Sequence, residues 1–175
     1  HSLTWNNITP VFCDIDPVTM NIDADKIESL ITPRTSGILA VHVFGTPCDV
    51  EKIQKIATKH KLKVIYDAAH AFGTKINGTG IGNFGDVSMF SFHPTKLFHS
   101  GEGGALTCKD RSLKERVDLL KNFGIQGQEA VVNSGLNGKM NELQAALGLT
   151  VLRHIDKEKK KRKLLYDTYI RCLKH

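Results

Sequence analysis

The sequence predicts an α/β domain whose mostly parallel sheet is sandwiched by helices, and two observations support this fold class. Short apolar runs alternate with helical patterns from the start of the chain to about residue 125. Strands that alternate with helices in this way pair mainly in parallel, because each helix provides a crossover connection. The chain has 175 residues, of which 41% are hydrophobic, and this is enough for one domain with a real core.

The first predicted elements follow this alternation. Pro10–Asp14 is predicted to be a strand, and Asp23 is predicted to cap a helix that runs through Leu30. Gly37–His42 is an apolar run that is typical of a buried strand. The next helix is predicted over Asp49–His60, and its inward-facing stripe consists of Val50, Ile53, Ile56 and Ala57.

The strands that follow have polar residues at their ends. Leu62–Tyr66 is predicted to be a strand with Asp67 directly after it. A glycine-rich stretch over residues 73–85 precedes the next predicted strand, Val87–Phe90. Gly103–Thr107 is predicted to be one more strand of the same sheet.

The last third of the chain changes character. A helix is predicted over Arg111–Lys121, and Gln126–Gly138 is a polar loop with glycines and no period. The pattern is then helical from about Asn141 to Leu173. A helical pattern of this length usually links a domain to its neighbour or breaks once.

Composition and charge exclude several classes of protein. No run of about eighteen apolar residues exists, so we expect no membrane span. The four cysteines have neither metal-ligand nor disulfide spacing, which fits a reducing, cytoplasmic location. The net charge of +6 includes the basic run Lys157–Lys163. This run is typical of nucleic-acid contact or of a solvated helix face, and we favour the helix face because no aromatic residues interleave with it.

Three polar motifs stand out between the apolar strands. They are Asp67–Gly73 (DAAHAFG), Ser91–Lys96 (SFHPTK) and Gly101–Gly104 (GEGG). Asp67 and Ser91 both fall just past a predicted strand, and ligands of open α/β sheets bind beyond the carboxyl ends of the strands. A carboxylate, a hydroxyl and an amine are therefore predicted to surround one crevice.

These three groups suit the chemistry of pyridoxal phosphate. A lysine amine forms a Schiff base with the cofactor aldehyde and later moves a proton between the substrate carbon and the cofactor carbon. An aspartate paired with the pyridine nitrogen keeps that nitrogen protonated, so that the ring can accept electrons. A hydroxyl and backbone N–H groups bind the phosphate.

The order and spacing of the motifs closely resemble those of the DegT/DnrJ/EryC1/StrS family of pyridoxal-phosphate-dependent sugar aminotransferases. Further segments extend the resemblance over nearly the whole chain: Pro10–Asp16, Ile31–Thr35, Val41–Gly45 and Gly135–Ala146. The resemblance implies the large domain of a fold-type I transferase over residues 1–140. It implies a long helix over residues 141–175 that leads toward a small C-terminal domain. The chain starts without a Met, and the resemblance implies further sequence before residue 1 and after residue 175, so we expect it to be truncated at both ends.

The resemblance implies a role for each candidate site residue. Lys96 is implied to be the Schiff-base lysine, Asp67 the partner of the pyridine nitrogen and Ser91 a phosphate ligand. His70 matches a position close to the cofactor ring. Asn137 matches an asparagine that reaches the phosphate of a neighbouring subunit, which implies a homodimer with a shared active site. Plainer roles remain open, since Asp67 and Asn137 can cap helices, Ser91 can lie in a turn and His70 can be a core residue.

The implied reaction transfers an amino group from glutamate, by way of the cofactor, to a keto group of a nucleotide-linked (dTDP or UDP) deoxysugar. Its setting would be the biosynthesis of cell-surface polysaccharide or of antibiotic sugars, with no metal, nucleic acid or membrane as partner. Two alternatives remain open. One is a sugar dehydratase that uses the same cofactor, which is less favoured because relatives of that kind lack the lysine that Lys96 provides. The other is a non-catalytic cofactor-binding or regulatory module.

Overall fold

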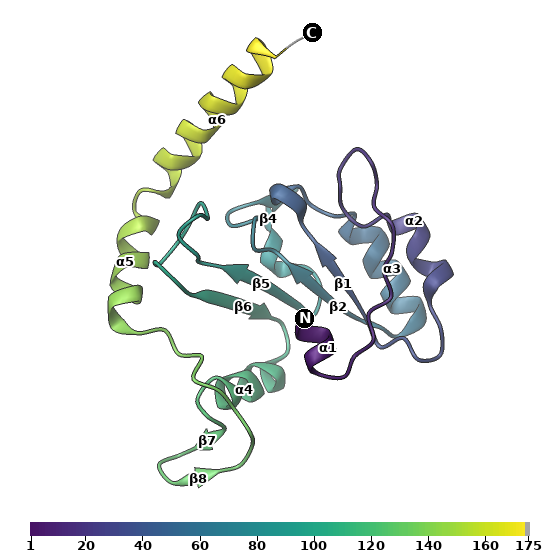
Figure 1. Cartoon of the computed structure of the whole chain (residues 1–175), viewed down its shortest axis with the longest axis vertical. Coiled ribbons are helices and arrows are strands. Elements are labelled where there is room, and N and C mark those ends of the chain that lie inside the picture. Colours follow the sequence, from purple (N-terminus) through teal and green to yellow (C-terminus); the bar gives the residue numbers. More distant parts are fainter. Residues whose placement is uncertain (174–175) are drawn as a thin grey trace. The chain divides into compact units, whose positions relative to one another are not determined.

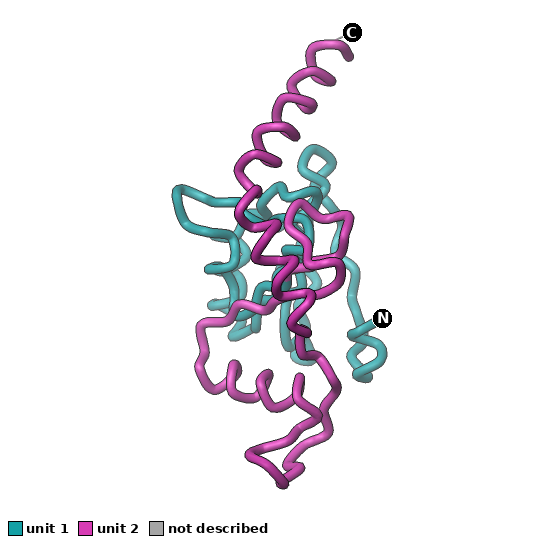
Figure 2. Tube along the Cα trace, turned by 90° about the vertical axis from the view of Figure 1, so that its left-hand side faces the viewer, with its two compact units in different colours: residues 1–89 teal, residues 90–175 magenta. Residues whose placement is uncertain are grey.

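The structure, a computed structural model, describes residues 1–173 and divides into two compact units. The first unit spans His1–Met89, and the second begins at Phe90 (Figure 2). The chain passes from one unit to the other within a single strand, β5, which runs from Val87 to Ser91.

The central sheet has the hydrogen-bonded order β1-β2-β5-β6. Its strands are β1 (Gly37–Val41), β2 (Lys63–Asp67), β5 and β6 (Gly104–Cys108), which confirms four of the predicted strands to within about two residues (Figure 1). β1 pairs in parallel with β2, and β2 pairs in parallel with β5. The register places Val41 beside Asp67 and Asp67 beside Met89, so adjacent strands end at one edge of the sheet.

Helix α3 (Val50–His60) covers this part of the sheet and confirms the predicted helix. It begins because the Asp49 side chain accepts a hydrogen bond from the Lys52 backbone N–H, and it ends at Lys61, whose backbone is left-handed. All four residues of the predicted stripe are buried. They join Ile38, Ala40, Val64 and Tyr66 in one hydrophobic cluster, which is the core of the first unit.

The prediction of a strand at Pro10–Asp14 is wrong. Helix α1 (Ser2–Trp5) precedes this segment. Backbone contacts occur only at its end, where the Asp23 N–H donates to the Asp14 carbonyl and Ile15 forms an isolated bridge with Ile22, as far as residues 1–173 show. A strand needs a neighbouring strand with which its backbone groups can pair along its length, and none pairs with Pro10–Asp14 within residues 1–173. The helix capped by Asp23 is confirmed in part, since α2 (Ala24–Ile27) continues only as a 3₁₀ turn, η1 (Glu28–Leu30).

Two regions that lack a hydrophobic period contain small hairpins. Within residues 73–85, β3 (Lys75–Ile76) pairs with β4 (Thr79–Gly80), and the 3₁₀ turn η3 (Ile81–Asn83) follows. The predicted loop after residue 125 likewise contains a pair, β7 (Ile125–Gln126) with β8 (Ala130–Val131). Strands of two residues are too short for alternation to predict them.

Three helices complete the second unit. α4 (Arg111–Leu120) confirms the predicted helix, and the helical pattern that follows residue 141 breaks once, into α5 (Glu142–Leu152) and α6 (Ile155–Cys172). Asn141 starts α5 with a capping box, in which its side chain and that of Gln144 each bond to the other's backbone N–H. The division into domains at residue 140 stays a prediction, and its last two residues, 174–175, lie outside the described residues.

Candidate active site

Asp67 is the last residue of β2, and hydrogen bonds hold the backbone around it. The His42 N–H donates to the Asp67 carbonyl oxygen (3.0 Å), and the Ala68 N–H donates to the carbonyl of Met89 (2.8 Å). The half-buried carboxylate accepts one bond, from the Ala69 N–H to Oδ1 at 3.0 Å. Its other oxygen has no protein donor within residues 1–173, so this carboxylate can pair with a cationic ring nitrogen.

His42 lies directly after β1, the strand next to Asp67. Its side chain is fully buried and stacks on Tyr66, with ring centroids 4.6 Å apart. Nδ1 accepts a hydrogen bond from the Cys48 N–H (3.0 Å), so the ring proton is on Nε2, and Nε2 has no partner within the described chain. Burial lowers the pKa of His42 to about 4, so the imidazole is neutral at pH 7.

Cys48 contacts both His42 and the end of β1. Its thiol donates to the Val41 carbonyl oxygen at 3.1 Å, and its side chain is buried. Burial raises the pKa of the thiol to about 12. Cys48 is therefore an uncharged side chain that packs near the end of β1.

His70 lies three residues after Asp67, at the surface of the same unit. Its imidazole stacks on the ring of Phe44, with centroids 5.8 Å apart and planes inclined by only 6°. The alternative of a core histidine is wrong, because His70 is exposed. The stack therefore presents the flat, polar imidazole of His70 near the strand end that carries Asp67 in the same unit.

Ser91 and Lys96 belong to one tight turn that follows β5 in the second unit. Ser91 Oγ accepts a hydrogen bond from the His93 N–H (3.3 Å), and the His93 carbonyl accepts one from the Lys96 N–H (2.9 Å). The His93 ring bonds to the Thr95 hydroxyl at 2.9 Å. The turn therefore fixes the hydroxyl and the amine a few residues apart on one short segment.

The glycines of the GEGG motif close this loop. The Phe92 N–H donates to the Gly103 carbonyl (2.8 Å), and the Phe92 and Phe98 rings meet edge to face at 4.7 Å. At Gly103, a Cβ would lie only 2.7 Å from Ser100 Oγ, so a larger residue does not fit there. Ser100 is buried and donates to the Glu102 carbonyl (2.7 Å). Glu102 thus shapes the loop through its backbone.

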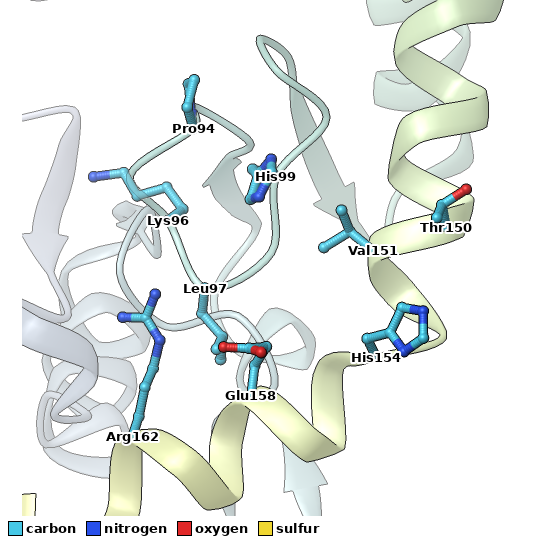
Figure 3. Close-up of a pocket in the computed structure, with 9 residues that line it drawn as sticks. All are labelled: Pro94, Lys96, Leu97, His99, Thr150, Val151, His154, Glu158 and Arg162. Atoms are coloured by element: carbon cyan, nitrogen blue, oxygen red, sulfur yellow. The ribbon is translucent and has the colours of Figure 1, made fainter. Parts of the chain in front are cut away.

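A pocket of about 280 Å³ lies beside Lys96 within the second unit (Figure 3). It is lined by Pro94, Lys96, Leu97, His99, Thr150, Val151, His154, Glu158 and Arg162. The loop after β5 supplies the first four residues. Helix α5 supplies Thr150 and Val151, α6 supplies Glu158 and Arg162, and His154 lies at the break between the two helices. The Lys96 side chain extends away from α5 in Figure 3, and the residue is partly exposed.

Asn137 is exposed in the second unit and forms a two-residue bridge with Asn122. It is not a helix cap, since Asn141 has that function at α5. The two units therefore divide the predicted residues, with Asp67 and His70 in the first and Ser91, Lys96 and Asn137 in the second. Sequence reasoning gave no role to Phe44, although an aromatic residue and a glycine directly after a strand signal a turn.

Within residues 1–173, no group of three or more His, Cys, Asp or Glu residues could hold a metal ion. No helix in this part of the chain is both long and apolar enough to cross a membrane.

Comparison with known proteins gives a consistent result. A sequence model of the DegT/DnrJ/EryC1/StrS aminotransferase family matches residues 1–175. A dTDP-4-amino-4,6-dideoxy-D-glucose transaminase from Shigella dysenteriae is 51% identical over 89% of this chain and 42% of its own length. A transaminase of the same name from Escherichia coli is 47% identical over 99% of this chain and 47% of its own length.

Solved structures agree with the sequence relatives. The crystal structure of S. venezuelae DesV in complex with a ketimine intermediate has a TM-score of 0.90 and 33% identity, and the match covers 97% of this chain and 46% of DesV. The fold is thus that of the large domain of fold-type I pyridoxal-phosphate-dependent transferases. The chain spans somewhat less than half the length of each of these relatives.

Proposed function

This chain belongs to the DegT/DnrJ/EryC1/StrS aminotransferase family, and we propose that the protein is a pyridoxal-phosphate-dependent aminotransferase that acts on a nucleotide-linked sugar. The observation that carries the proposal is the pairing of strand ends around β5. Asp67 ends β2 beside Met89 of β5, and Ser91, two residues after Met89, opens the turn that holds Lys96. Asp67 is therefore the last residue of β2, Ser91 is the last residue of β5, and Lys96 follows in the turn. The carboxyl ends of strands are where open α/β sheets bind ligands.

These residues fit the cofactor chemically. When bound, the cofactor supplies an aldehyde that exchanges amines and a ring that accepts electrons. With the cofactor bound, Asp67 would pair its free oxygen with the ring nitrogen, and Ser91 would donate its hydroxyl to the phosphate. Lys96 would hold the cofactor through Nζ, and the same amine would carry the proton. His70 would lie close to the ring, and the buried, neutral His42 adds no charge at this strand end.

The substrate proposal is a nucleotide-linked deoxysugar with a keto group, and the proposed amine donor is glutamate. Its support is that the relatives from Shigella dysenteriae and Escherichia coli are dTDP-sugar transaminases. The presence of Lys96 argues against a dehydratase that lacks this residue. A cytoplasmic location fits the absence of a membrane-crossing helix in residues 1–173 and remains part of the proposal.

A homodimer with shared sites completes the proposal. α5 carries apolar residues around its whole circumference, and Leu143, Leu147, Leu149 and Leu152 are exposed within the described chain. A helix that is apolar on all sides is normally buried, so α5 is expected to be covered in the native assembly. In a twofold dimer each subunit would donate Asn137 to the phosphate of the other.

The role of Lys96 is tested in the native protein with pyridoxal 5′-phosphate. Borohydride reduction should fix the cofactor to Lys96, and peptide mass spectrometry should locate it there. Lys96→Ala should abolish both the adduct and the transfer of the amino group. Lys109→Ala, at an exposed lysine just after β6, is the matched control and should leave both unchanged. An adduct on any other lysine would refute the assignment.

The role of Asp67 is tested by Asp67→Asn. Asn can still accept the Ala69 N–H through Oδ1, so the strand end and cofactor docking should persist. The neutral amide no longer favours a protonated ring nitrogen, so turnover should fall by about two orders of magnitude or more. Near-normal turnover with normal cofactor binding would rule this role out.

The shared site is tested by mixing two impaired variants, Lys96→Ala and Asn137→Ala. If each Asn137 serves the partner's Lys96, a mixed dimer has one doubly impaired site and one intact site. Random exchange should then restore about a quarter of the native activity, because about half of the dimers are mixed. If Asn137 serves its own subunit, every site keeps a lesion, and mixing should restore nothing beyond the average of the two variants.

A further inference from the structure

Phe44 has a backbone conformation that large residues avoid. Its φ and ψ are 52° and 22°, in the left-handed region, and it lies in the 3₁₀ turn η2 (Val43–Gly45) directly after β1. Its side chain is nevertheless 85% exposed, so burial of the ring does not compensate for the strain. Asn or Gly would adopt this conformation at lower cost.

Two buried contacts hold the turn in place. Asn21 is only 2% exposed, and its side chain bonds to both ends of the turn. Oδ1 accepts from the Val43 N–H (2.8 Å), and Nδ2 donates to the Thr46 carbonyl (3.0 Å). Gly45 then packs so closely on His70 that a Cβ would lie 2.9 Å from the His70 carbonyl oxygen.

The result of this arrangement is a fixed ring stack at the surface. The turn is held against the backbone of His70, and Phe44 lays its ring parallel to the imidazole at 5.8 Å. No hydrogen bond fixes the His70 ring within the described chain, so the stack is the contact that limits its rotation. A parallel aromatic neighbour restricts an imidazole to one plane without changing its hydrogen-bonding capacity.

We propose that Phe44 is a positioning residue that fixes the plane of the His70 imidazole against the bound cofactor ring. The proposal rests on the proposed function, which places His70 beside that ring. Phe44 acts through His70 and has no chemical step of its own. If Phe44 served only the fold, a substitution that removes the backbone strain should raise thermal stability and should not lower the affinity for the cofactor.

The substitution Phe44→Asn separates the two roles. Asn tolerates the left-handed backbone but provides no ring, so the thermal midpoint without cofactor should rise or stay unchanged. The affinity for pyridoxal 5′-phosphate should nevertheless fall between about twofold and tenfold, which is the range expected for one aromatic contact. Phe44→Tyr keeps the ring and should retain native affinity, within about twofold.

The stack can also be followed without cofactor. The ring carbon signals of His70 in an NMR spectrum should shift in Phe44→Asn and remain near their native positions in Phe44→Tyr. In a His70→Gln background, Phe44→Asn should cause no further loss of cofactor affinity, because the proposed route runs through the imidazole.

The outcomes distinguish this inference from the function on which it rests. If the native protein binds no pyridoxal 5′-phosphate at Lys96, the proposed function fails and this inference fails with it. If the native protein binds the cofactor but Phe44→Asn has native affinity and an unshifted His70 signal, only this inference fails. A loss of affinity in Phe44→Asn that persists unchanged in the His70→Gln background would also overturn it.

Discussion

Helices α3 and α5 have the same length, 11 residues, yet they are stabilised in different ways. α3 concentrates its apolar residues on one stripe and buries all of Val50, Ile53, Ile56 and Ala57 against β1 and β2. α5 spreads its apolar residues over all sides and buries only Gly148 within the described chain. The first helix therefore depends on packing inside its own unit, whereas the second depends on its capping box and on whatever covers it in the assembled protein.

The largest effect is expected from truncating the stripe of α3. Ile53 is 0% exposed, so Ile53→Ala should lower the free energy of unfolding by about 2–5 kcal/mol, measured by denaturant titration. Leu149→Ala is the matched change on α5, where the leucine is 64% exposed, and should cost less than about 1 kcal/mol in the isolated chain. Equal losses at the two positions would contradict the contrast between the helices.

A comparable effect should arise from acid at the end of β1. His42 is neutral when folded because burial lowers its pKa from 6.5 to about 4, whereas the unfolded chain binds a proton below pH 6.5. The contribution of neutral His42 to the free energy of unfolding is therefore fully present above pH 6.5. It is lost as the pH falls toward 4, by up to about 3 kcal/mol.

His42→Phe removes the titrating group and keeps a flat ring for the stack on Tyr66. The variant should be less stable at pH 7, because the Cys48 N–H loses its acceptor. Its stability should nevertheless change less between pH 6.5 and 4.5 than that of the native chain. An unchanged pH slope in urea denaturation would show that other groups cause the acid sensitivity.

A smaller effect is expected at the helix caps. Asp49→Ala removes the cap of α3, and Asn141→Ala removes the cap of α5, each at a cost of about 1 kcal/mol in local helix stability. The two losses should differ in the probe that detects them. The Asp49 change should appear in cooperative unfolding of the first unit, and the Asn141 change mainly in amide exchange at the start of α5. Protection of α5 that is unaffected by Asn141→Ala would argue against dependence on the capping box.

The smallest effect is expected on the exposed helix α6. Lys163 Nζ bonds to both carboxylate oxygens of Asp167 at 2.7 Å, one helical turn away. Both side chains are more than half exposed, so Asp167→Asn should change stability by no more than about 0.5 kcal/mol. Circular dichroism should show nearly native helix content, and a large loss would mean that surface pairs rather than burial maintain this helix.

The accuracy of the sequence predictions follows the same contrast between the two kinds of element. β1, β2, β5 and α3 were predictable because they bury one face within the chain, and burial imposes a period on the sequence. Pro10–Asp14 has a suitable composition but no partner strand among residues 1–173, and strand pairing is not a local property. The break between α5 and α6 falls at Arg153 and His154, neither of which is a strong helix breaker, so its place could not be predicted.

The candidate site was predictable in part. The motifs identified Asp67, His70, Ser91 and Lys96, and the structure places each of them next to a strand end or in a tight turn, although it does not test their roles. Phe44 was not predictable as a partner of His70, because sequence rules assign left-handed backbone to Gly, Asn or Asp. Its conformation depends on the buried side chain of Asn21, which is 22 residues from Val43 in the sequence.

The buried thiol behind β1 also makes the chain a reporter of its own opening. Alkylating reagents react with the thiolate, and a pKa of about 12 leaves Cys48 almost entirely protonated at neutral pH as well as shielded. Cys172 is exposed and should be alkylated immediately. Cys48 should be modified later and slowly. The rate of this modification, followed by mass spectrometry, should therefore report how often the segment between β1 and α3 opens, without the need to introduce a cysteine.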